Sequence, residues 1–222
     1  MLNAQAEKQA CYFCDEIQNP ALIKKLLGSS FSHNDRILYS SEHVVAIPGY
    51  GPQVYPYILI LTKRHISSFL EATSIEKREI FQCLDWLLDI GIYSSSKLCV
   101  FEHGGDILTS CSCVDHCHLH VISSDVGLYE KVDWGKDEIN CEIDATTTLD
   151  DVESYLLLGT YEHKANRINA KLNLREDIRE HQYFRRRIAQ ILSEDLWSWK
   201  SGMNYKWIDR LVGDIKRLEA NR

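Results

Sequence analysis

Apolar residues form short runs in the first half of the chain and helical repeats near its end. Runs of strand length occupy residues 43–47, 57–62 and 98–101, and the turn residues at 48–52 separate the first two. Short apolar runs bounded by Gly and Pro are typical of strands in a sheet. We therefore expect three strands before residue 102.

A helix is predicted between the second and third strands. Thr73 and Glu76 have the spacing of a capping box, apolar residues then recur three or four positions apart, and Gly91 can end the helix. The expected helix covers residues 74–90. A helix between strands with short connections indicates an α+β domain, in which the helix packs on one face of an antiparallel sheet.

The rest of the chain is expected to be less regular and then helical. Residues 123–151 contain nine acidic residues against two lysines and few long apolar runs, which favours an irregular loop or hairpin. The other predicted elements are a short helix at 21–27, a strand at 155–158 and helices at 175–192 and 205–218. We therefore divide the chain into a core at 1–125 and a mainly helical C-terminal extension at 126–222, packed on the core.

Composition limits the classes of function. The chain has 222 residues, 45% of them hydrophobic, and five Trp, which is typical of a packed globular protein. Its net charge of −7 argues against nucleic acid as a partner, and its longest aliphatic run, 58–61, is far too short for a membrane span. Eight cysteines without a visible secretion signal indicate a reducing compartment, so a cytoplasmic location is expected.

The most informative segment is a histidine-rich run at 115–122. In an extended strand, His116, His118 and His120 share one face, while the intervening Cys, Leu and Val fill the other. Side chains two positions apart on a strand lie roughly 6.5–7 Å from each other. This spacing suits three linked roles along an extended anion, or one metal ligand beside two catalytic groups. The alternative is a surface strand that happens to be rich in His.

The central imidazoles suit phosphoryl or nucleotidyl transfer. A neutral imidazole is a competent nucleophile near pH 7 when an acceptor holds its other ring N–H. His118, at the centre of the run, is the best-placed nucleophile, and His120 is the best-placed donor to a phosphate oxygen. Near the N-terminus, Cys11-x-x-Cys14 is ambiguous by itself: it suits half a zinc site, a redox pair or a chance spacing.

The His116-x-His118-x-His120 run with its apolar neighbours resembles the signature of the histidine triad (HIT) superfamily of nucleotide hydrolases and transferases. The resemblance extends to the two N-terminal cysteines, to Lys63-Arg64-His65 and to Glu102-His103-Gly104, and covers roughly residues 11–122. It implies a HIT-like antiparallel sheet and a covalent nucleotidyl intermediate on the middle histidine, His118. Many members of the family pair, so it also implies a possible homodimer.

The same resemblance implies a metal site. A zinc-bearing bacterial branch of the family uses the C-x-x-C pair, the histidine after the second strand and the first triad histidine. These positions are Cys11, Cys14, His65 and His116 here. Two thiolates and two imidazoles form a closed tetrahedral set, which indicates a structural zinc rather than a catalytic one.

Three positions depart from the family pattern. Gly49 stands where members usually have an Asp that holds the ribose hydroxyls, and Glu102-His103-Gly104 replaces the usual Asn-x-Gly. The loop that often reads Gly-Gln-Ser has Cys111-Ser112-Cys113, in which Ser112 can still donate to a phosphate.

The extension adds two further substrate-binding residues. The run from His181 to Arg186, with Trp197-Ser198-Trp199 downstream, resembles the C-terminal part of some longer bacterial HIT-like proteins. Gln182 and Arg186 are four apart, so in a helix they share a face, and an Arg fork matches phosphate oxygens. The alternative is a solvated basic face.

Three functions remain to be compared. The preferred hypothesis is a HIT-type phosphohydrolase or nucleotidyltransferase that cleaves a phosphoanhydride or phosphoramidate of a nucleotide-like substrate through His118. The second is a non-catalytic protein that binds a phosphorylated metabolite, a nucleotide or a partner protein in the same pocket. The third is a redox protein built on the Cys11 and Cys14 pair, which predicts no stoichiometric zinc.

Overall fold

The computed structural model describes residues 11–19, 21–22, 31–33, 36–105, 114–148, 152, 154–174, 180–195, 197–199 and 204–222. Most of the predicted helix at 21–27, the loop containing Ser112 and the start of the predicted helix at 175–192 therefore lie outside the described residues.

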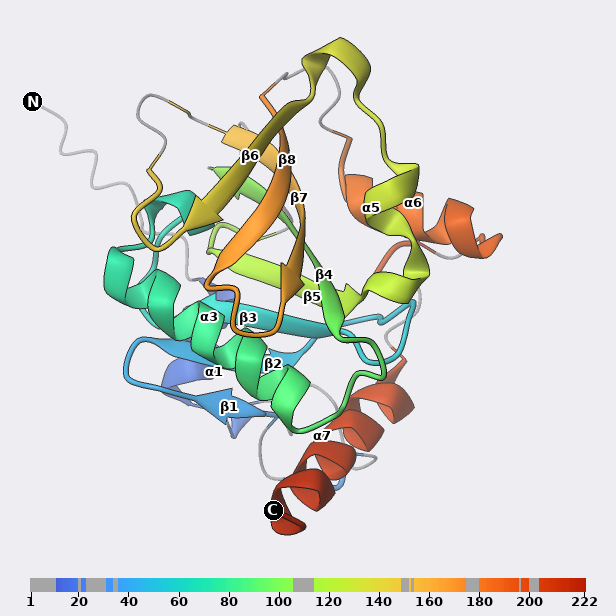
Figure 1. The fold of residues 1–222 in the computed structure, drawn as a ribbon. Helices are drawn as coiled ribbons and strands as arrows, with labels where there is room; N and C mark the ends of the chain where they lie inside the picture. The colour runs from blue at the N-terminus through green and yellow to red at the C-terminus, as the bar shows by residue number, and fades with distance from the viewer. Residues whose placement is uncertain are drawn as a thin grey trace, which may run out of the picture.

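The described residues fold around one eight-stranded antiparallel sheet (Figure 1). In spatial order its strands are β1 (Tyr39–Ser40), β2 (Val44–Pro48), β3 (Ile58–Thr62), β5 (His118–Ser123), β4 (Lys97–Gly105), β7 (Ser154–Glu162), β8 (Arg167–Asn173) and β6 (Ile139–Asp144). The sheet is strongly twisted, since β6–β8 stand upright in Figure 1 while β1–β3 run across the view. An α+β fold is confirmed.

Helices lie on both faces of this sheet. They are α1 (Tyr12–Gln18), α3 (Ser74–Asp89), α5 (Leu128–Lys131), α6 (Tyr183–Leu192) and α7 (Tyr205–Ala220), with 3-10 turns at Phe69–Glu71, Ser124–Val126 and Gly135–Asp137. One hydrophobic cluster joins α3 and α7 to the sheet, and a second joins α1, α5 and α6 to the opposite face. We call these the α3 face and the α6 face.

Helix α3 confirms the prediction for residues 74–90. The Thr73 side chain accepts from the backbone N–H of Glu76, and the Glu76 carboxylate accepts from the backbone N–H of Thr73, which is a complete capping box. Its apolar positions Ile80, Leu84 and Leu87 have no exposed surface. Burial of this stripe fixes α3 against the sheet.

The irregular loop or hairpin predicted for residues 123–151 is wrong in part. This segment contains α5 and the edge strand β6, which pairs with β8 along six positions. Strand β6 is mostly exposed, and an edge strand open to solvent can be polar, so the apolar alternation that signals a strand is weak there. Strand β7 is longer than the strand predicted at 155–158, and no strand was predicted where β8 lies.

The sheet continues through both parts of the proposed division. Strand β4 of the core pairs with β7 of the extension along nine positions, from Lys97–Glu162 to Gly105–Ser154. The extension therefore contributes three strands as well as helices. The boundary at residue 125 stays a prediction.

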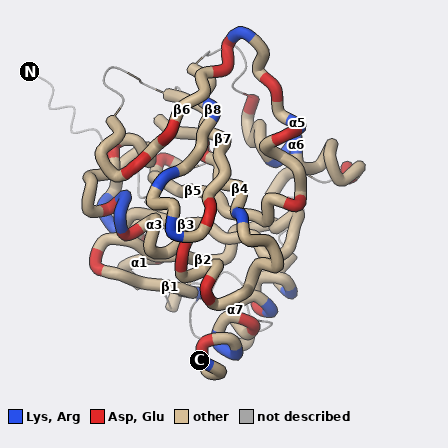
Figure 2. Tube along the Cα trace, viewed as in Figure 1, with Lys and Arg blue, Asp and Glu red and all other residues tan. Residues whose placement is uncertain are grey.

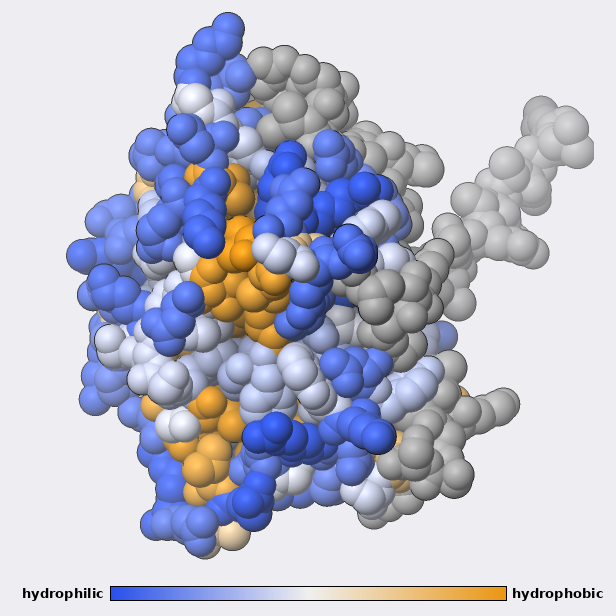
Figure 3. Space-filling view, turned by 90° about the vertical axis from the view of Figure 1, so that its right-hand side faces the viewer, coloured by the Kyte–Doolittle hydropathy of each residue, from blue (hydrophilic) through white to orange (hydrophobic). Residues whose placement is uncertain are grey.

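Charged residues of both signs are distributed along the trace, and α7 carries both (Figure 2). The side of the molecule shown in Figure 3 is mostly hydrophilic, with hydrophobic areas at its centre and below it. Among the described helices, none has the length and apolar character needed to cross a lipid bilayer.

Candidate functional site

Strand β5 places its histidines and its apolar residues on opposite faces of the sheet, as predicted. The alternating residues Cys117, Leu119 and Val121 are fully buried in the cluster of the α3 face. His118 and His120 line a cavity on the other face, with ring centroids 4.9 Å apart. The central position of β5 between β3 and β4 holds both imidazoles on a rigid backbone.

The cavity has a volume of about 500 Å³. This size falls in the range of pockets for small-molecule ligands. Its described lining is largely aromatic and comprises Tyr12, Phe13, Gly49, Tyr50, Tyr57, Leu59, Phe101, His103, Val114, His118, His120, Gln182, Phe184, Arg185, Trp199 and Tyr205. Residues of α1, the β2–β3 turn, the sheet and the C-terminal segment thus meet around the two histidines.

The hydrogen bond of His118 fixes its tautomer. Its Nδ1 lies 2.6 Å from the carbonyl oxygen of His116, an acceptor, so Nδ1 carries the proton and donates it. The lone pair is then on Nε2, the nitrogen available to the cavity. Burial lowers the pKa of His118 from its usual value, so the imidazole is neutral at pH 7.

His120 is held by a different set of contacts. Its Nδ1 lies 2.9 Å from the hydroxyl of Tyr57, and its ring stacks on Phe101 at a centroid distance of 4.7 Å. Burial, together with the positive charge of Arg185 and the other cavity histidines, lowers the pKa of His120 well below its usual value. Both imidazoles are therefore neutral at physiological pH.

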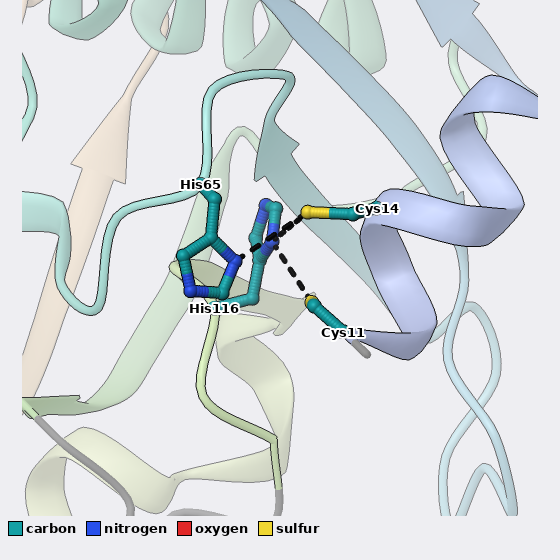
Figure 4. A group of neighbouring side chains, drawn as sticks. All are labelled: Cys11, Cys14, His65 and His116. Carbon is teal, nitrogen blue, oxygen red and sulfur yellow. Dashed lines mark hydrogen bonds between the residues drawn. The ribbon is translucent and has the colours of Figure 1, made fainter. Parts of the chain in front are cut away.

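A second cluster lies beside His118 and consists of Cys11, Cys14, His65 and His116 (Figure 4). One potential ligand atom from each residue lies within 4.8 Å of all the others. His116 Nδ1 is 3.4 Å from Cys11 Sγ and 3.5 Å from Cys14 Sγ, and His65 Nδ1 is 3.4 Å from Cys14 Sγ. This cluster could hold a metal ion.

The distances in the cluster fit a tetrahedral metal. Bonds of about 2.3 Å to sulfur and about 2.0 Å to nitrogen at tetrahedral angles separate S and N by about 3.5 Å. His116 Nε2 donates to the carbonyl oxygen of Thr62 at 2.7 Å, which leaves Nδ1 directed at the thiols. Burial lowers the pKa of His116 to about 4 and keeps it in the neutral, ligating form.

Three different segments deliver these four residues. The two cysteines come from the start of α1, His65 follows β3, and His116 precedes β5 (Figure 4). On the outer side, His65 Nε2 lies 3.9 Å from the carboxylate of Asp115. This separation is longer than a hydrogen bond, so the carboxylate is a neighbour of the His65 ring and does not fix its orientation.

The two residues proposed from the extension have different positions. Gln182 lines the cavity, but Arg186 is not among its described lining residues. The guanidinium of Arg186 instead lies 3.7 Å above the ring of Trp197, and its Nε donates to the carbonyl oxygen of His181. The prediction that Gln182 and Arg186 share one face of a helix was wrong, because α6 begins at Tyr183 and Gln182 is its left-handed N-cap.

Arg185, which sequence reasoning missed, takes the place at the cavity. It is 7% exposed and donates from Nε to the carbonyl oxygen of Trp197 at 2.8 Å. Its terminal nitrogens donate to the carbonyl oxygens of Tyr50 and Gly51. Arg185 therefore links the extension to the β2–β3 turn, and a triple-Arg run gives no sequence signal for which member turns inward.

The departures from the HIT pattern have structural counterparts. A Cβ at Gly49 would lie 2.4 Å from Cδ1 of the Tyr57 ring, so that ring fills the space where a side chain would stand. Glu102 is fully buried on the α3 face, where its carboxylate accepts from the backbone N–H of Phe69 at 3.0 Å. It is absent from the described lining of the cavity, whereas His103 is part of it.

No protein-family model matches the sequence, and no curated protein matches it. Solved structures do resemble the chain. A HIT family hydrolase from Clostridium thermocellum is 23% identical, covers 57% of this chain and 95% of its own, and has a TM-score of 0.36. A DUF4931 family protein from Bacillus cereus is 12% identical, with 81% and 99% covered and a TM-score of 0.44.

The AMP complex of yeast Ap4A phosphorylase is 11% identical, with 79% of this chain and 77% of the other covered and a TM-score of 0.37. In its motif and among solved structures, the chain is similar to proteins of the histidine triad type.

Proposed function

We propose that the protein is a HIT-type phosphohydrolase or nucleotidyltransferase that acts on a phosphoanhydride or phosphoramidate of a nucleotide-like substrate. The observation that carries this proposal is the orientation of His118. Its Nδ1–H is held by the His116 carbonyl at 2.6 Å, and burial keeps the ring neutral beside a ligand-sized cavity. A neutral imidazole with one nitrogen held by an acceptor is an activated nucleophile.

The proposed reaction has two steps. His118 Nε2 attacks phosphorus, a P–N bond forms, and the bond from phosphorus to the leaving oxygen or nitrogen breaks with its electron pair on the leaving atom. The positive charge that develops on the imidazole is stabilised through Nδ1–H and the His116 carbonyl. Water or another acceptor hydroxyl then attacks phosphorus, and the P–N bond breaks with its electron pair returning to His118 Nε2. The proton that the attacking hydroxyl loses to solvent balances the proton that the leaving atom takes up from solvent.

His120 is proposed to bind the phosphate. If the Tyr57 hydroxyl donates to Nδ1 across the 2.9 Å contact, the proton of His120 is on Nε2, which can donate to a phosphate oxygen. Ser112, which lies outside the described residues, stays a further proposed phosphate donor, and Gln182 stays a proposed substrate contact at the cavity. The position of Arg186 over Trp197 argues for replacing it with Arg185 in this role.

The metal in the Cys11, Cys14, His65 and His116 cluster is proposed to be zinc with a structural role. Two thiols and two imidazoles at tetrahedral spacing form the donor set that zinc prefers, and a four-residue set leaves no open position for substrate. The site would attach α1 to the segment that leads into β5, and so hold the cavity wall against His118.

The proposed setting is the cytoplasm, with a phosphorylated small molecule as the partner and without nucleic acid or membrane. A homodimer is also proposed, on the family resemblance alone. Sedimentation analysis at several protein concentrations tests the homodimer directly.

A covalent phosphorus label tests the proposed reaction. Wild type and His118→Asn are incubated with labelled dinucleoside polyphosphates, nucleoside phosphoramidates and nucleotide sugars, then separated from free label. We expect a labelled wild type and an unlabelled His118→Asn. The matched control is His103→Asn, which changes another cavity histidine and should still be labelled, because His103 is not the proposed nucleophile.

The alternative is a non-catalytic binding protein, and it is supported by the absence of a side chain at Gly49 beneath the Tyr57 ring. It predicts that wild type binds a phosphate ligand but neither turns over nor becomes labelled with any substrate of the panel. That outcome would reject the enzyme proposal.

A further inference from the structure

Aromatic rings extend outward from the two catalytic candidates along the cavity. From His118 the series runs through Phe13, Tyr12, Tyr50 and Trp199, with centroid separations of 5.5, 6.0, 6.0 and 6.3 Å between successive rings. From His120 a second series passes through Phe101 at 4.7 Å to Phe184 at a further 4.9 Å. A ligand with its phosphate at the histidines therefore extends between aromatic side chains.

Hydrogen-bond acceptors suited to a sugar are scarce in this cavity. A vicinal diol is bound best by a carboxylate, which accepts two hydrogen bonds at once. Among the described lining residues none is Asp or Glu. The Gln182 carboxamide oxygen already accepts from the backbone N–H of Trp199 at 3.3 Å. On the β2–β3 turn, the Tyr57 ring fills the space above Gly49, so no side chain reaches into the cavity from that position.

Two rings at the outer end of the first series are fixed in place. The guanidinium of Arg36 lies 3.9 Å from the centroid of the Tyr50 ring, and the Tyr50 hydroxyl is hydrogen-bonded to the Tyr12 hydroxyl. Trp199 is attached to the start of α6 through Gln182. Tyr50 and Trp199 are each partly buried, and both line the cavity.

We propose that this site recognises its substrate through a flat aromatic ring stacked against Tyr50 and Trp199, and does not read the hydroxyls of a ribose. The substrate class is then a phosphate compound with a nucleobase or aryl group, in which the sugar is a spacer. This inference rests on the proposed function, which places the phosphate at His118 and His120. It makes Trp199, a residue of the extension, a determinant of specificity.

Matched ligands test the two halves of this inference. The dissociation constants of AMP, 2′,3′-dideoxy-AMP and ribose 5-phosphate are measured by titration calorimetry on the full chain. AMP and its dideoxy form share the ring and the phosphate, and differ only in the diol. We expect these two to bind within about twofold of each other, and ribose 5-phosphate to bind at least tenfold more weakly.

Substitution of Trp199 tests the stacking residue. Stacking of a base on an aromatic side chain stabilises binding, so Trp199→Ala should weaken AMP and dideoxy-AMP alike by about fivefold or more. Trp207→Ala is the matched control. This Trp lies on α7 with its ring 5.9 Å from that of Tyr55, and it is not among the described lining residues. The control should bind both ligands as wild type does.

The outcomes separate this inference from the proposed reaction. The recognition proposal is overturned if AMP binds tenfold more tightly than dideoxy-AMP, or if ribose 5-phosphate binds as tightly as AMP. It is also overturned if Trp199→Ala binds both nucleotides as wild type does, or if neither nucleotide binds. If the two nucleotides bind equally while no adduct forms on His118, the reaction is wrong and the recognition stands. If an adduct forms but only from substrates with a diol, the reaction stands and the recognition is wrong.

Discussion

The side chain of Tyr57 contacts two parts of the candidate site, Gly49 and His120. Its ring occupies the space above Gly49, and its hydroxyl lies 2.9 Å from His120 Nδ1. A residue without a side chain at Gly49 is therefore required by the position of the Tyr57 ring, and the same Tyr57 side chain supports the His120 imidazole.

Glu102 is a second residue whose role depends on its surroundings. Its side chain accepts from the backbone N–H of Phe69 and from the hydroxyl of Tyr155, within a fully buried environment. Burial raises the pKa of this carboxyl to about 7 in spite of these hydrogen bonds, which favour the charged form. The protein therefore carries a buried group that titrates near neutrality.

The raised pKa predicts how stability varies with pH. Between pH 4.5 and about 7 the folded state holds a proton on Glu102 that the unfolded state has released, so the free energy of unfolding falls as pH rises through this window. The contribution is on the order of 3 kcal/mol. In Glu102→Gln it should disappear, because the amide can accept the same hydrogen bonds without ionising.

Urea unfolding of both proteins at pH 5 and pH 8 measures this effect. The wild type should lose stability relative to Glu102→Gln between these two values. Parallel pH profiles for the two proteins would show that the carboxyl does not titrate in this range.

At the scale of elements, α7 packs beside α3 on the α3 face of the sheet. Four apolar residues of α7 join the core there, namely Ile208, Leu211, Val212 and Ile215. Two acidic residues of α7 also accept hydrogen bonds, Asp209 from Ser32 and Asp214 from the hydroxyl of Tyr55. Its apolar spacing predicted both the helix and its buried face.

Gly213 in the interior of α7 gives a prediction about this helix. A Cβ there would have His33 Nε2 as its nearest neighbour at 3.7 Å, an ordinary contact. Gly213→Ala should therefore raise the free energy of unfolding by about 0.5–1 kcal/mol, because Ala restricts the unfolded chain more than Gly does. The matched substitution Gly49→Ala should lower it by about 1–3 kcal/mol, because its Cβ overlaps the Tyr57 ring.

Thermal and urea unfolding of the two variants check the sign of each effect. If Gly213→Ala and Gly49→Ala changed the free energy of unfolding equally, the distances from each added Cβ to its neighbours would not explain the result.

At the scale of the whole molecule, the Cys and His cluster joins segments far apart in the sequence. Cys11 and His116 are separated by 105 positions, yet their ligand atoms lie 3.4 Å apart. A bound metal would close this long loop and attach α1 to the strand that carries His118. Metal binding and the stability of the cavity should therefore be coupled.

Metal removal tests this coupling. Purified protein should contain one zinc per chain by elemental analysis, and Cys14→Ser should lose most of it. Chelation or Cys14→Ser should lower the melting temperature by at least about 5 °C, as expected for a loss of about 2 kcal/mol in a chain of this size. Cys141→Ser, which changes a cysteine of the edge strand β6, is the control and should keep its zinc.

A wild-type protein without stoichiometric zinc would favour the redox hypothesis for the Cys11 and Cys14 pair. Equal zinc in wild type and Cys14→Ser would show that the metal is bound elsewhere.

Local periodicity along the chain is enough to predict several features of the protein. Alternation placed His118 and His120 on one face of a strand and Leu119 on the other, and capping and spacing defined α3 nearly to the residue. The resemblance to the HIT family, rather than periodicity, named the four Cys and His residues that the structure brings together.

The residues that complete the site are set by how the folded segments pack together. Arg185 rather than Arg186 turns inward because α6 begins after Gln182, and Tyr57 covers Gly49 because β2 and β3 pair across the turn. The edge strand β6 is defined by its partner β8 rather than by apolar alternation. These features arise from contacts between distant segments, and such contacts leave no periodic signal in the sequence.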